Sequence, residues 1–324
     1  MSRSTLIYTH GGGRLGNQLL RFAHWIAWAL EHEREVEVID FAFWPFAELF
    51  AHWNEFPGCL FPSRPSCASR IASIVQGLPL RWRRPIQNGH RIPRLLHGVG
   101  GWFPGWQAIE LNDAVGEHVE LDDPAFLLRI RDRPVTTCAG WKFSTWRAVE
   151  AHEPALRPLF RPASAWMERG LQFMESIRSK HDCVVGILIR QTDYRAWRDG
   201  RFYYPTEQYA RWIKELLDLR TGRNPAIVIA CDERQDPRAF SGLPYFFSKG
   251  AFNEGGHWFE SLVALSLCDV ILSPPSTFAA AAAFIGNVPL LPLIEGRQEL
   301  AQAQILPAGL AQAARHPVFS LAVN

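Results

Sequence analysis

The sequence has few of the features that define metal-binding proteins. Its six cysteines form no CxxC pair, which argues against a zinc site, and we expect no metal ion in the protein. Three of them lie within apolar runs, which indicates buried thiols in a reducing cytoplasm. The predicted location is therefore cytoplasmic. The six residues are Cys59, Cys67, Cys138, Cys183, Cys231 and Cys268.

Long apolar runs and a strong excess of one charge are also missing. The apolar segment 19–30 is shorter than the roughly 20 residues that span a membrane, and it carries Arg21 and His24. We expect a core helix there. A formal net charge of +2 is too small for the basic field of a nucleic-acid-binding protein, so we expect no nucleic-acid partner.

What the sequence contains is the composition and the pattern of an α/β protein. Its 324 residues, 48% of them hydrophobic, exceed the usual size of a single core. We predict two domains, 1–163 and 164–324, separated where Pro154, Pro158 and Pro162 interrupt the chain.

The second half alternates strands and helices, which predicts a mainly parallel sheet covered by helices. The predicted strands are 183–189, 226–230, 245–247, 270–272 and 288–291, and the helices are 166–180, 206–219, 258–267 and 278–285. In the first half we predict strands at 4–9, 35–39 and 135–139 and a helix that ends near residue 33. Segment 41–134 is predicted to form loops and short helices, because it is rich in prolines and aromatic residues.

A glycine-rich turn follows the first predicted strand. Its glycines satisfy G-x-G-x-x-G, and Asp40 closes the next strand, so the turn fits a dinucleotide-binding fold. A turn that serves packing alone is the simpler alternative. Asn17 and Gln18 lie in the first helical turn, where side-chain amides suit hydrogen bonds to a ligand. The three glycines are Gly11, Gly13 and Gly16.

A second motif stands at the end of the buried strand 183–189, where Arg190 and Asp193 emerge from its carboxyl end. Ligands of open α/β sheets bind at that edge, and arginine suits bidentate contacts with phosphate oxygens. The alternative is that Arg190 and Asp193 simply pair with each other across a turn.

A third motif, Ser273-Pro-Pro-Ser-Thr-Phe278, joins the strand 270–272 to the next helix. Ser276 or Thr277 is expected to cap that helix, and a helix start is also an anion site, so the two roles are compatible. Asp232 follows the strand 226–230, where a carboxylate suits either a base or ribose of the ligand or a turn.

The order of these motifs resembles that of the fucosyltransferase superfamily, which includes alpha-1,2-fucosyltransferases, rhizobial nodulation alpha-1,6-fucosyltransferases and protein O-fucosyltransferases. Segment 13–18 is similar to the family's G-x-x-G-N-Q, segment 187–194 to its H-x-R-R-x-D-Y, and segment 260–286 to its third block. The resemblance implies a GT-B fold, in which two Rossmann-like domains face each other across a cleft. It also implies metal-independent, inverting transfer of fucose from GDP-fucose to a glycan hydroxyl, in the assembly of a surface polysaccharide.

The resemblance also implies roles for individual residues. Arg190 would contact the β-phosphate of a donor held mainly by the C-terminal domain, and Asp193 is the candidate catalytic base. Gly13, Gly16, Asn17 and Gln18 belong to the block that would face the donor from the other domain. The residues that would line the pyrophosphate and the base are Ser276, Thr277 and Phe278, with Asp232 as a further candidate.

The sequence departs from the family at two positions, because Leu188 replaces its histidine and Gln191 its second arginine. Two other hypotheses therefore stay open. One is an NAD-dependent oxidoreductase that uses the glycine turn and Asp40, and the other is a non-catalytic glycan-binding protein on a transferase scaffold.

The expected acceptor is an oligosaccharide or a lipid-linked glycan. A basic stretch with Trp82 suits peripheral contact with the inner face of a membrane, although a solvated surface also explains it. Its arginines are Arg70, Arg81, Arg83, Arg84, Arg91 and Arg94.

Overall fold

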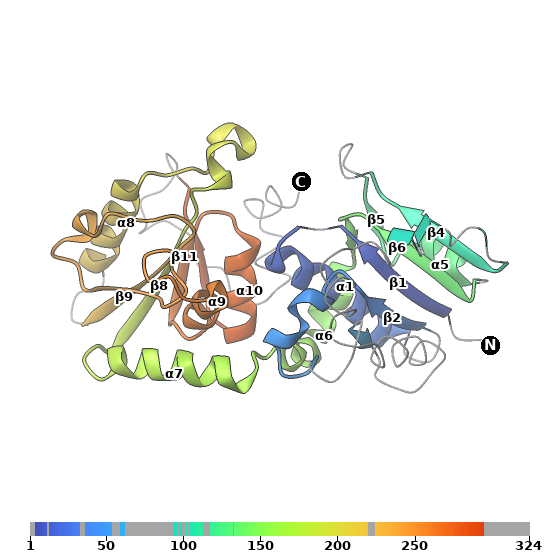
Figure 1. Cartoon of the computed structure of the whole chain (residues 1–324), viewed down its shortest axis with the longest axis horizontal. Coiled ribbons are helices and arrows are strands. Elements are labelled where there is room, and N and C mark those ends of the chain that lie inside the picture. The colour runs from blue at the N-terminus through green and yellow to red at the C-terminus, as the bar shows by residue number, and fades with distance from the viewer. Residues whose placement is uncertain are drawn as a thin grey trace. The chain divides into compact units, whose positions relative to one another are not determined.

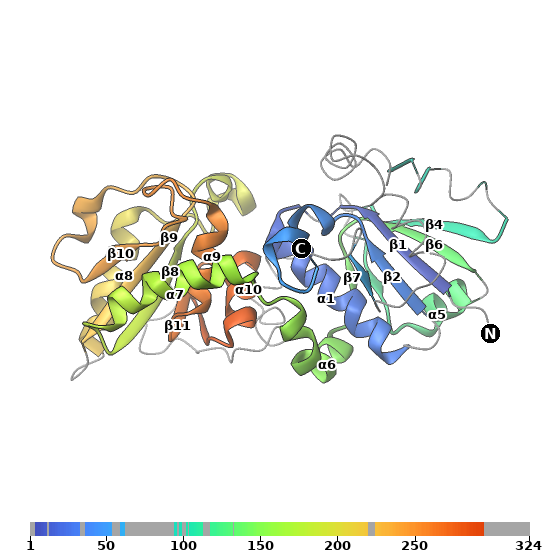
Figure 2. The ribbon, with the colours of Figure 1, turned by 60° about the horizontal axis from the view of Figure 1, so that its bottom comes forward.

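The computed structural model describes residues 4–294, except 12, 33–35, 54–58, 62–93, 96, 99–101, 103, 113–116, 132 and 220–223. The chain divides into two compact units, Met1–Arg161 and Pro162–Asn324, close to the predicted boundary at residue 163. Each unit is built on its own sheet, as Figures 1 and 2 show.

The sheet of the first unit has the order β3-β2-β1-β6-β4, and all its neighbouring strands are parallel except β2 and β3. Its strands are β1 (Ser4–His10), β2 (Val36–Asp40), β3 (Leu60–Phe61), β4 (Trp106–Glu110) and β6 (Val135–Ala139). Strands β5 (Val119–Glu120) and β7 (Phe143–Ser144) form a separate parallel pair. The helices among the described residues of this unit include α1 (Leu15–Glu31), the 3-10 helix η1 (Trp44–Leu49), α5 (Pro124–Arg131) and α6 (Trp146–Leu159).

Helix α6 and strand β4 are among the elements of this unit that differ from the sequence-based prediction. Helix α6 runs through Pro154 and Pro158, which were expected to interrupt the chain. A proline costs a helix one hydrogen bond but keeps a helical φ, and the buried side of α6, which includes Val149 and Leu156, packs toward α1. Strand β4 lies in the segment predicted as loops and short helices, because pairing with β6 outweighs its weak local pattern.

The second unit contains a fully parallel sheet of order β10-β9-β8-β11-β12. The predicted strands are confirmed as β8 (Cys183–Ile189), β9 (Pro225–Cys231), β10 (Tyr245–Phe247), β11 (Val270–Ser273) and β12 (Leu290–Pro292). The predicted helices are confirmed as α7 (Ser164–Arg178), α8 (Thr206–Leu219), α9 (Trp258–Ser266) and α10 (Thr277–Gly286). Three short 3-10 helices, η3 (Asp193–Arg195), η4 (Trp197–Gly200) and η5 (Pro237–Phe240), lie in the connections.

Helices cover both faces of this sheet (Figure 1). Val185 and Ile187 of β8 pack with α8 on one face, and Val184 packs with α7 and α9 on the other. A parallel strand that is buried on both faces reads as a continuous apolar run, which is why the sequence predicted β8 so closely.

Small residues bring α10 close to α9. The alanines 279–283 are all buried, and a Cβ atom on Gly286 would lie 1.9 Å from the carbonyl oxygen of Ser266. The predicted helix 278–285 is therefore tightly packed along its alanine run.

The cysteines of the described residues are buried and unbridged, as predicted, while Cys67 lies outside those residues. Burial raises the pKa of Cys231 to about 11. None of the helices in the described ranges is long and apolar enough to cross a membrane. Most of the basic stretch, from Arg70 to Arg91, lies outside the described residues, so its membrane contact stays a prediction.

Candidate functional site

The candidate site lies at the carboxyl edge of the second sheet. Strands β8, β9 and β11 are parallel neighbours, so the residues that follow them share one edge. Arg190 follows β8, Asp232 follows β9, and Ser276 stands between β11 and α10. Helices α9 and α10 begin at this edge, because a helix that connects parallel strands runs back against them. The structure thus brings together the predicted residues of the C-terminal half.

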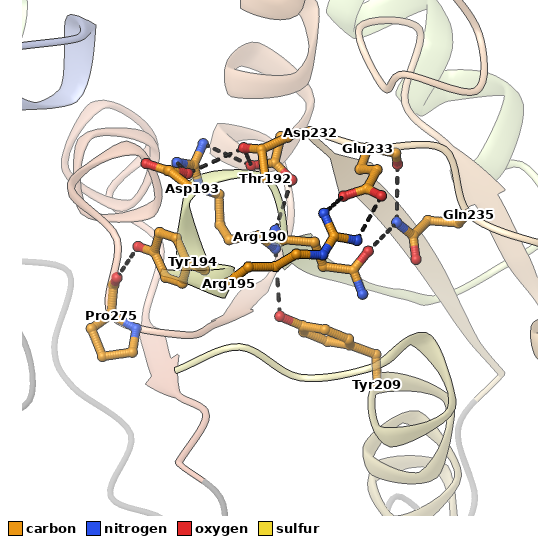
Figure 3. A network of polar contacts seen from close by, with 11 residues as sticks. Arg190, Thr192, Asp193, Tyr194, Arg195, Tyr209, Asp232, Glu233, Gln235 and Pro275 are labelled. Atoms are coloured by element: carbon orange, nitrogen blue, oxygen red, sulfur yellow. Dashed lines mark hydrogen bonds and ion pairs between the residues drawn. The ribbon is translucent and has the colours of Figure 1, made fainter. Parts of the chain in front are cut away.

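Arg190 is the centre of a polar network, which Figure 3 shows. Its Nη2 atom donates a hydrogen bond to Asp193 Oδ1 at 2.6 Å, and its Nη1 atom lies 3.2 Å from Asp232 Oδ2. Its guanidinium carbon stands 5.0 Å from the centroid of the Tyr194 ring. The Nε atom is buried and makes no hydrogen bond. The predicted alternative, a pair between Arg190 and Asp193, is therefore present, but as one part of a larger arrangement.

Asp232 fixes the turn after β8. Its Oδ1 atom accepts the backbone N–H of Gln191 at 2.9 Å, and its Oδ2 atom accepts the Thr192 hydroxyl at 2.8 Å. A carboxylate that accepts several hydrogen bonds holds its donors firmly. Asp232 therefore positions Arg190 and the turn, whereas its contact with a donor base or ribose stays a prediction.

Tyr194 joins this turn to the start of α10. Its hydroxyl donates a hydrogen bond to the carbonyl oxygen of Pro275. Burial raises the pKa of Tyr194 to about 12, although the neighbouring Arg190 and Ser276 lower it. Sequence reasoning missed this bridge, since nothing in the local pattern places Tyr194 beside Pro275.

Helix α10 begins where it was predicted to begin, but the predicted side-chain cap by Ser276 is not observed. Ser276 is the N-cap residue, yet its side chain makes no capping hydrogen bond. The first intrahelical bond runs from Ala280 to the carbonyl of Ser276, so the N–H groups ahead of it point toward the edge of the sheet, where helix starts attract anions. The Phe278 ring lies 6.4 Å from the ring of Trp258, at the start of α9. Trp258 is 39% exposed, and the sequence analysis did not identify it as a residue of the site.

The two departures from the family motif are both buried. Leu188 lies in β8 opposite Ala230. The amide of Gln191 donates to the carbonyl of Tyr204 at 2.9 Å and accepts from Gln235 Nε2 at 2.8 Å. Gln191 therefore belongs to a neutral network inside the unit, which explains how a position with an arginine in the family holds an uncharged residue here.

Arg195, a further cation beside the site, is fully engaged. It forms two hydrogen bonds of 2.7 Å with the carboxylate of Glu233, and this pairing lowers the pKa of Glu233. Its charge is therefore neutralised by its own partner.

The glycine turn of the first unit is held from inside. Gly11 and Gly13 have positive φ values of 123° and 69°, which favour glycine. The Nε2 atom of Gln18 donates to the carbonyl oxygens of both, at 2.5 and 3.0 Å. Gln18 thus shapes the turn. Gly16 is buried and Asn17 is half-buried. Their contacts with a donor stay predictions.

Asp40 is fully buried and has partners within the unit. It accepts a hydrogen bond from Arg21, which also donates to Gln18, and another from the backbone N–H of Phe43 at 2.8 Å. Burial raises its pKa, and Arg21 opposes the rise. A ribose hydroxyl cannot reach this carboxylate without breaking the network. The dinucleotide hypothesis, which needs Asp40 at the ligand, is not favoured.

No protein-family model matches the chain, and no curated protein matches it. Solved structures do. FUT1 of Arabidopsis thaliana, a mutant in complex with GDP, is 14% identical with a TM-score of 0.53, over 94% of this chain and 74% of that one. NodZ alpha-1,6-fucosyltransferase co-crystallised with GDP is 16% identical with a TM-score of 0.52, over 95% and 99% of the chains. NodZ from Bradyrhizobium gives the same identity and TM-score, over 95% and 100%.

The chain has the fold of these fucosyltransferases. The predicted fold class, α/β with the parallel sheets of GT-B enzymes, is confirmed, while the cleft between the two domains stays a prediction. Within this fucosyltransferase fold, the described residues contain no group of three or more His, Cys, Asp or Glu side chains suited to hold a metal ion.

Proposed function

We propose that this chain transfers fucose from GDP-fucose to a hydroxyl group of a glycan, with inversion at the anomeric carbon and without a metal ion. The observation that carries the proposal is the place of Arg190. It stands at the carboxyl edge of β8, is tied through Tyr194 to the start of α10, and lies in the unit where the sheet edge collects the predicted donor residues.

The chemistry requires positive charge at the leaving group. The oxygen of the acceptor hydroxyl attacks the anomeric carbon of fucose, and the bond from that carbon to the β-phosphate oxygen breaks. GDP leaves with the electron pair, so negative charge grows on the β-phosphate. A fixed guanidinium at Arg190 and the N–H groups at the start of α10 would stabilise that charge, because they are oriented before the reaction begins.

The remaining roles in the proposal come from the sequence. Asp193 is the candidate base that takes the proton of the acceptor hydroxyl. Ser276, Thr277 and Phe278 would contact the pyrophosphate and the base of the donor. The acceptor, an oligosaccharide or a lipid-linked glycan of a surface polysaccharide, and the cytoplasmic location stay predictions.

Calorimetry with GDP, GDP-fucose and UDP-sugars tests the donor. We expect GDP and GDP-fucose to bind and UDP-sugars not to bind. If a UDP-sugar bound and no guanine nucleotide did, the proposed donor would be wrong. Release of GDP from GDP-fucose in the presence of glycan acceptors then distinguishes a transferase from a glycan-binding protein, which would bind the acceptor and leave the donor intact.

Arg190→Ala tests the central residue. A hydrogen bond to a charged group contributes about 1.5–3 kcal/mol, so we expect GDP affinity to fall by roughly tenfold to a hundredfold, with turnover lost. Arg178→Ala is the matched control, because Arg178 pairs with Asp269 at 3.0 Å, just ahead of β11 at the opposite edge of the sheet. Circular dichroism checks that both variants are folded. If they lost GDP affinity and turnover to the same extent, Arg190 would have no specific role in the mechanism.

A further inference from the structure

Arg190 contacts two carboxylates that are held very differently. Asp232 is 16% exposed and is fixed by the backbone of Gln191 and the hydroxyl of Thr192. Asp193 is 51% exposed, and its hydrogen bonds from Arg190 and Thr192 converge on one atom, Oδ1. Asp232 is therefore an anchor, whereas Asp193 stands on the solvent side of the guanidinium.

Both terminal nitrogens of the guanidinium already pair with carboxylates, so a phosphate that approaches them meets negative charge at each one. Its Nη2 atom is taken by Asp193, its Nη1 atom by Asp232, and its Nε atom is buried. One cation and two carboxylates also leave the cluster with a formal charge of −1, which disfavours the approach of a diphosphate. A carboxylate oxygen and a phosphate oxygen make the same kind of charge-assisted bond to arginine, so either can occupy the same place.

We propose that Asp193 competes with the diphosphate of the donor for Arg190, and that its carboxylate is displaced when the donor binds. The inference rests on the proposed function, since it takes Arg190 as the donor-binding residue. Asp193 is the partner that leaves, because an exposed ion pair contributes little and the chain around Asp232 would have to reorganise for that carboxylate to move. The competition selects for ligands with two linked phosphates, since a weaker anion displaces Asp193 less effectively.

Asp193→Asn tests the competition, because the amide keeps the size of the side chain and removes its charge. We expect the Kd for GDP to fall by about threefold to tenfold, since the exposed pair and the repulsion of the diphosphate are both lost. The Kd for inorganic pyrophosphate should fall as well. Asp232→Asn should act in the opposite direction and weaken GDP binding, because the turn that carries Arg190 loses its anchor.

Glu233→Gln is the matched control. It removes one negative charge from the same edge, but Glu233 pairs with Arg195 and not with Arg190. We expect its Kd for GDP to fall clearly less than that of Asp193→Asn, because Glu233 does not contact Arg190 and the charge of the exposed Arg195 that it leaves is screened by solvent. Asp193→Ser, which also removes the carboxylate, should reproduce the gain.

The inference is overturned if Asp193→Asn and Asp193→Ser bind GDP no more tightly than the wild type, or if Glu233→Gln gains as much. A failure of the proposed function gives another result, in which the wild type binds no guanine nucleotide. In that case the Kd for inorganic pyrophosphate tests the competition by itself. Tighter binding of pyrophosphate by Asp193→Asn than by the wild type supports the competition, and unchanged or absent binding refutes it.

Discussion

The hydroxyl of Tyr194 is the most informative single group to remove, because it joins two loops of the site and its ionisation is measurable. Tyr194→Phe deletes the hydrogen bond to the buried carbonyl of Pro275 and keeps the ring beside Arg190. A buried carbonyl that loses its donor costs about 1–3 kcal/mol. We therefore expect the variant to unfold at a lower urea concentration at pH 8, with the free energy of unfolding reduced by that amount.

The pH dependence of this difference follows from the pKa of Tyr194. Its value is about 12 in the folded protein, against about 10 in an unfolded chain. Below pH 10 the tyrosine is protonated in both states, and its contribution is complete. Between pH 10 and 12 the unfolded chain loses the proton first, so the wild type loses stability as the pH rises, by about 1.4 kcal/mol per pH unit at most. Phenylalanine does not titrate.

Urea unfolding at pH 8, 10 and 11, followed by tryptophan fluorescence, measures the effect. Other groups with raised pKa values, such as Cys231 and Tyr209, occur in both proteins and cancel in the difference. The gap in the free energy of unfolding between wild type and variant should shrink above pH 10. A gap that stays constant from pH 8 to 11 would show that the Tyr194 hydroxyl does not make this buried contact.

Three further substitutions test the scaffold. Asp40→Asn leaves Arg21 buried without its anion, so the free energy of unfolding should fall by about 3–5 kcal/mol in urea titrations. A decrease below about 1 kcal/mol would contradict the buried pair. Gly11→Ala places a Cβ atom 2.6 Å from the hydroxyl of Tyr8, at a φ of 123° that favours glycine. The melting temperature should therefore fall clearly, and an unchanged melting temperature would contradict the described geometry of the turn. Gln191→Arg restores the charge of the family motif but buries it among Tyr204 and Gln235, so calorimetry should show no gain in GDP affinity, and the stability should decrease.

The sequence predicted the second unit well, because its elements have strong local signals. The run of β8 is apolar throughout, as a strand covered on both faces requires, and its carboxyl end correctly located Arg190. The edge that gathers Arg190, Asp232 and Ser276 also followed from parallel strand direction alone. Pattern and direction are local properties, so they can be read without the tertiary structure.

The partners of each side chain could not be read in the same way. The bond from Tyr194 to Pro275 joins residues 81 positions apart, and the burial of Gln191 depends on Gln235, 44 positions away. Helix α6 was missed because proline is a strong local signal against a helix, while the packing that sustains α6 comes from α1. The contribution of Asp232 to the turn after β8 likewise appears only when two strands lie side by side.

The small residues of α10 connect the interior of the second unit to the turn at Ser276. Gly286 has no room for a Cβ atom against Ser266, and the alanines 279–283 have almost no exposed surface. The position of α10 against α9 is therefore fixed by close packing. A single methyl group added at the far end of the helix would shift its axis and, with it, the turn at Ser276. Positions remote from the sheet edge therefore help to set where the N–H groups at the start of α10 lie, and in the proposed function they influence how closely those groups approach the donor.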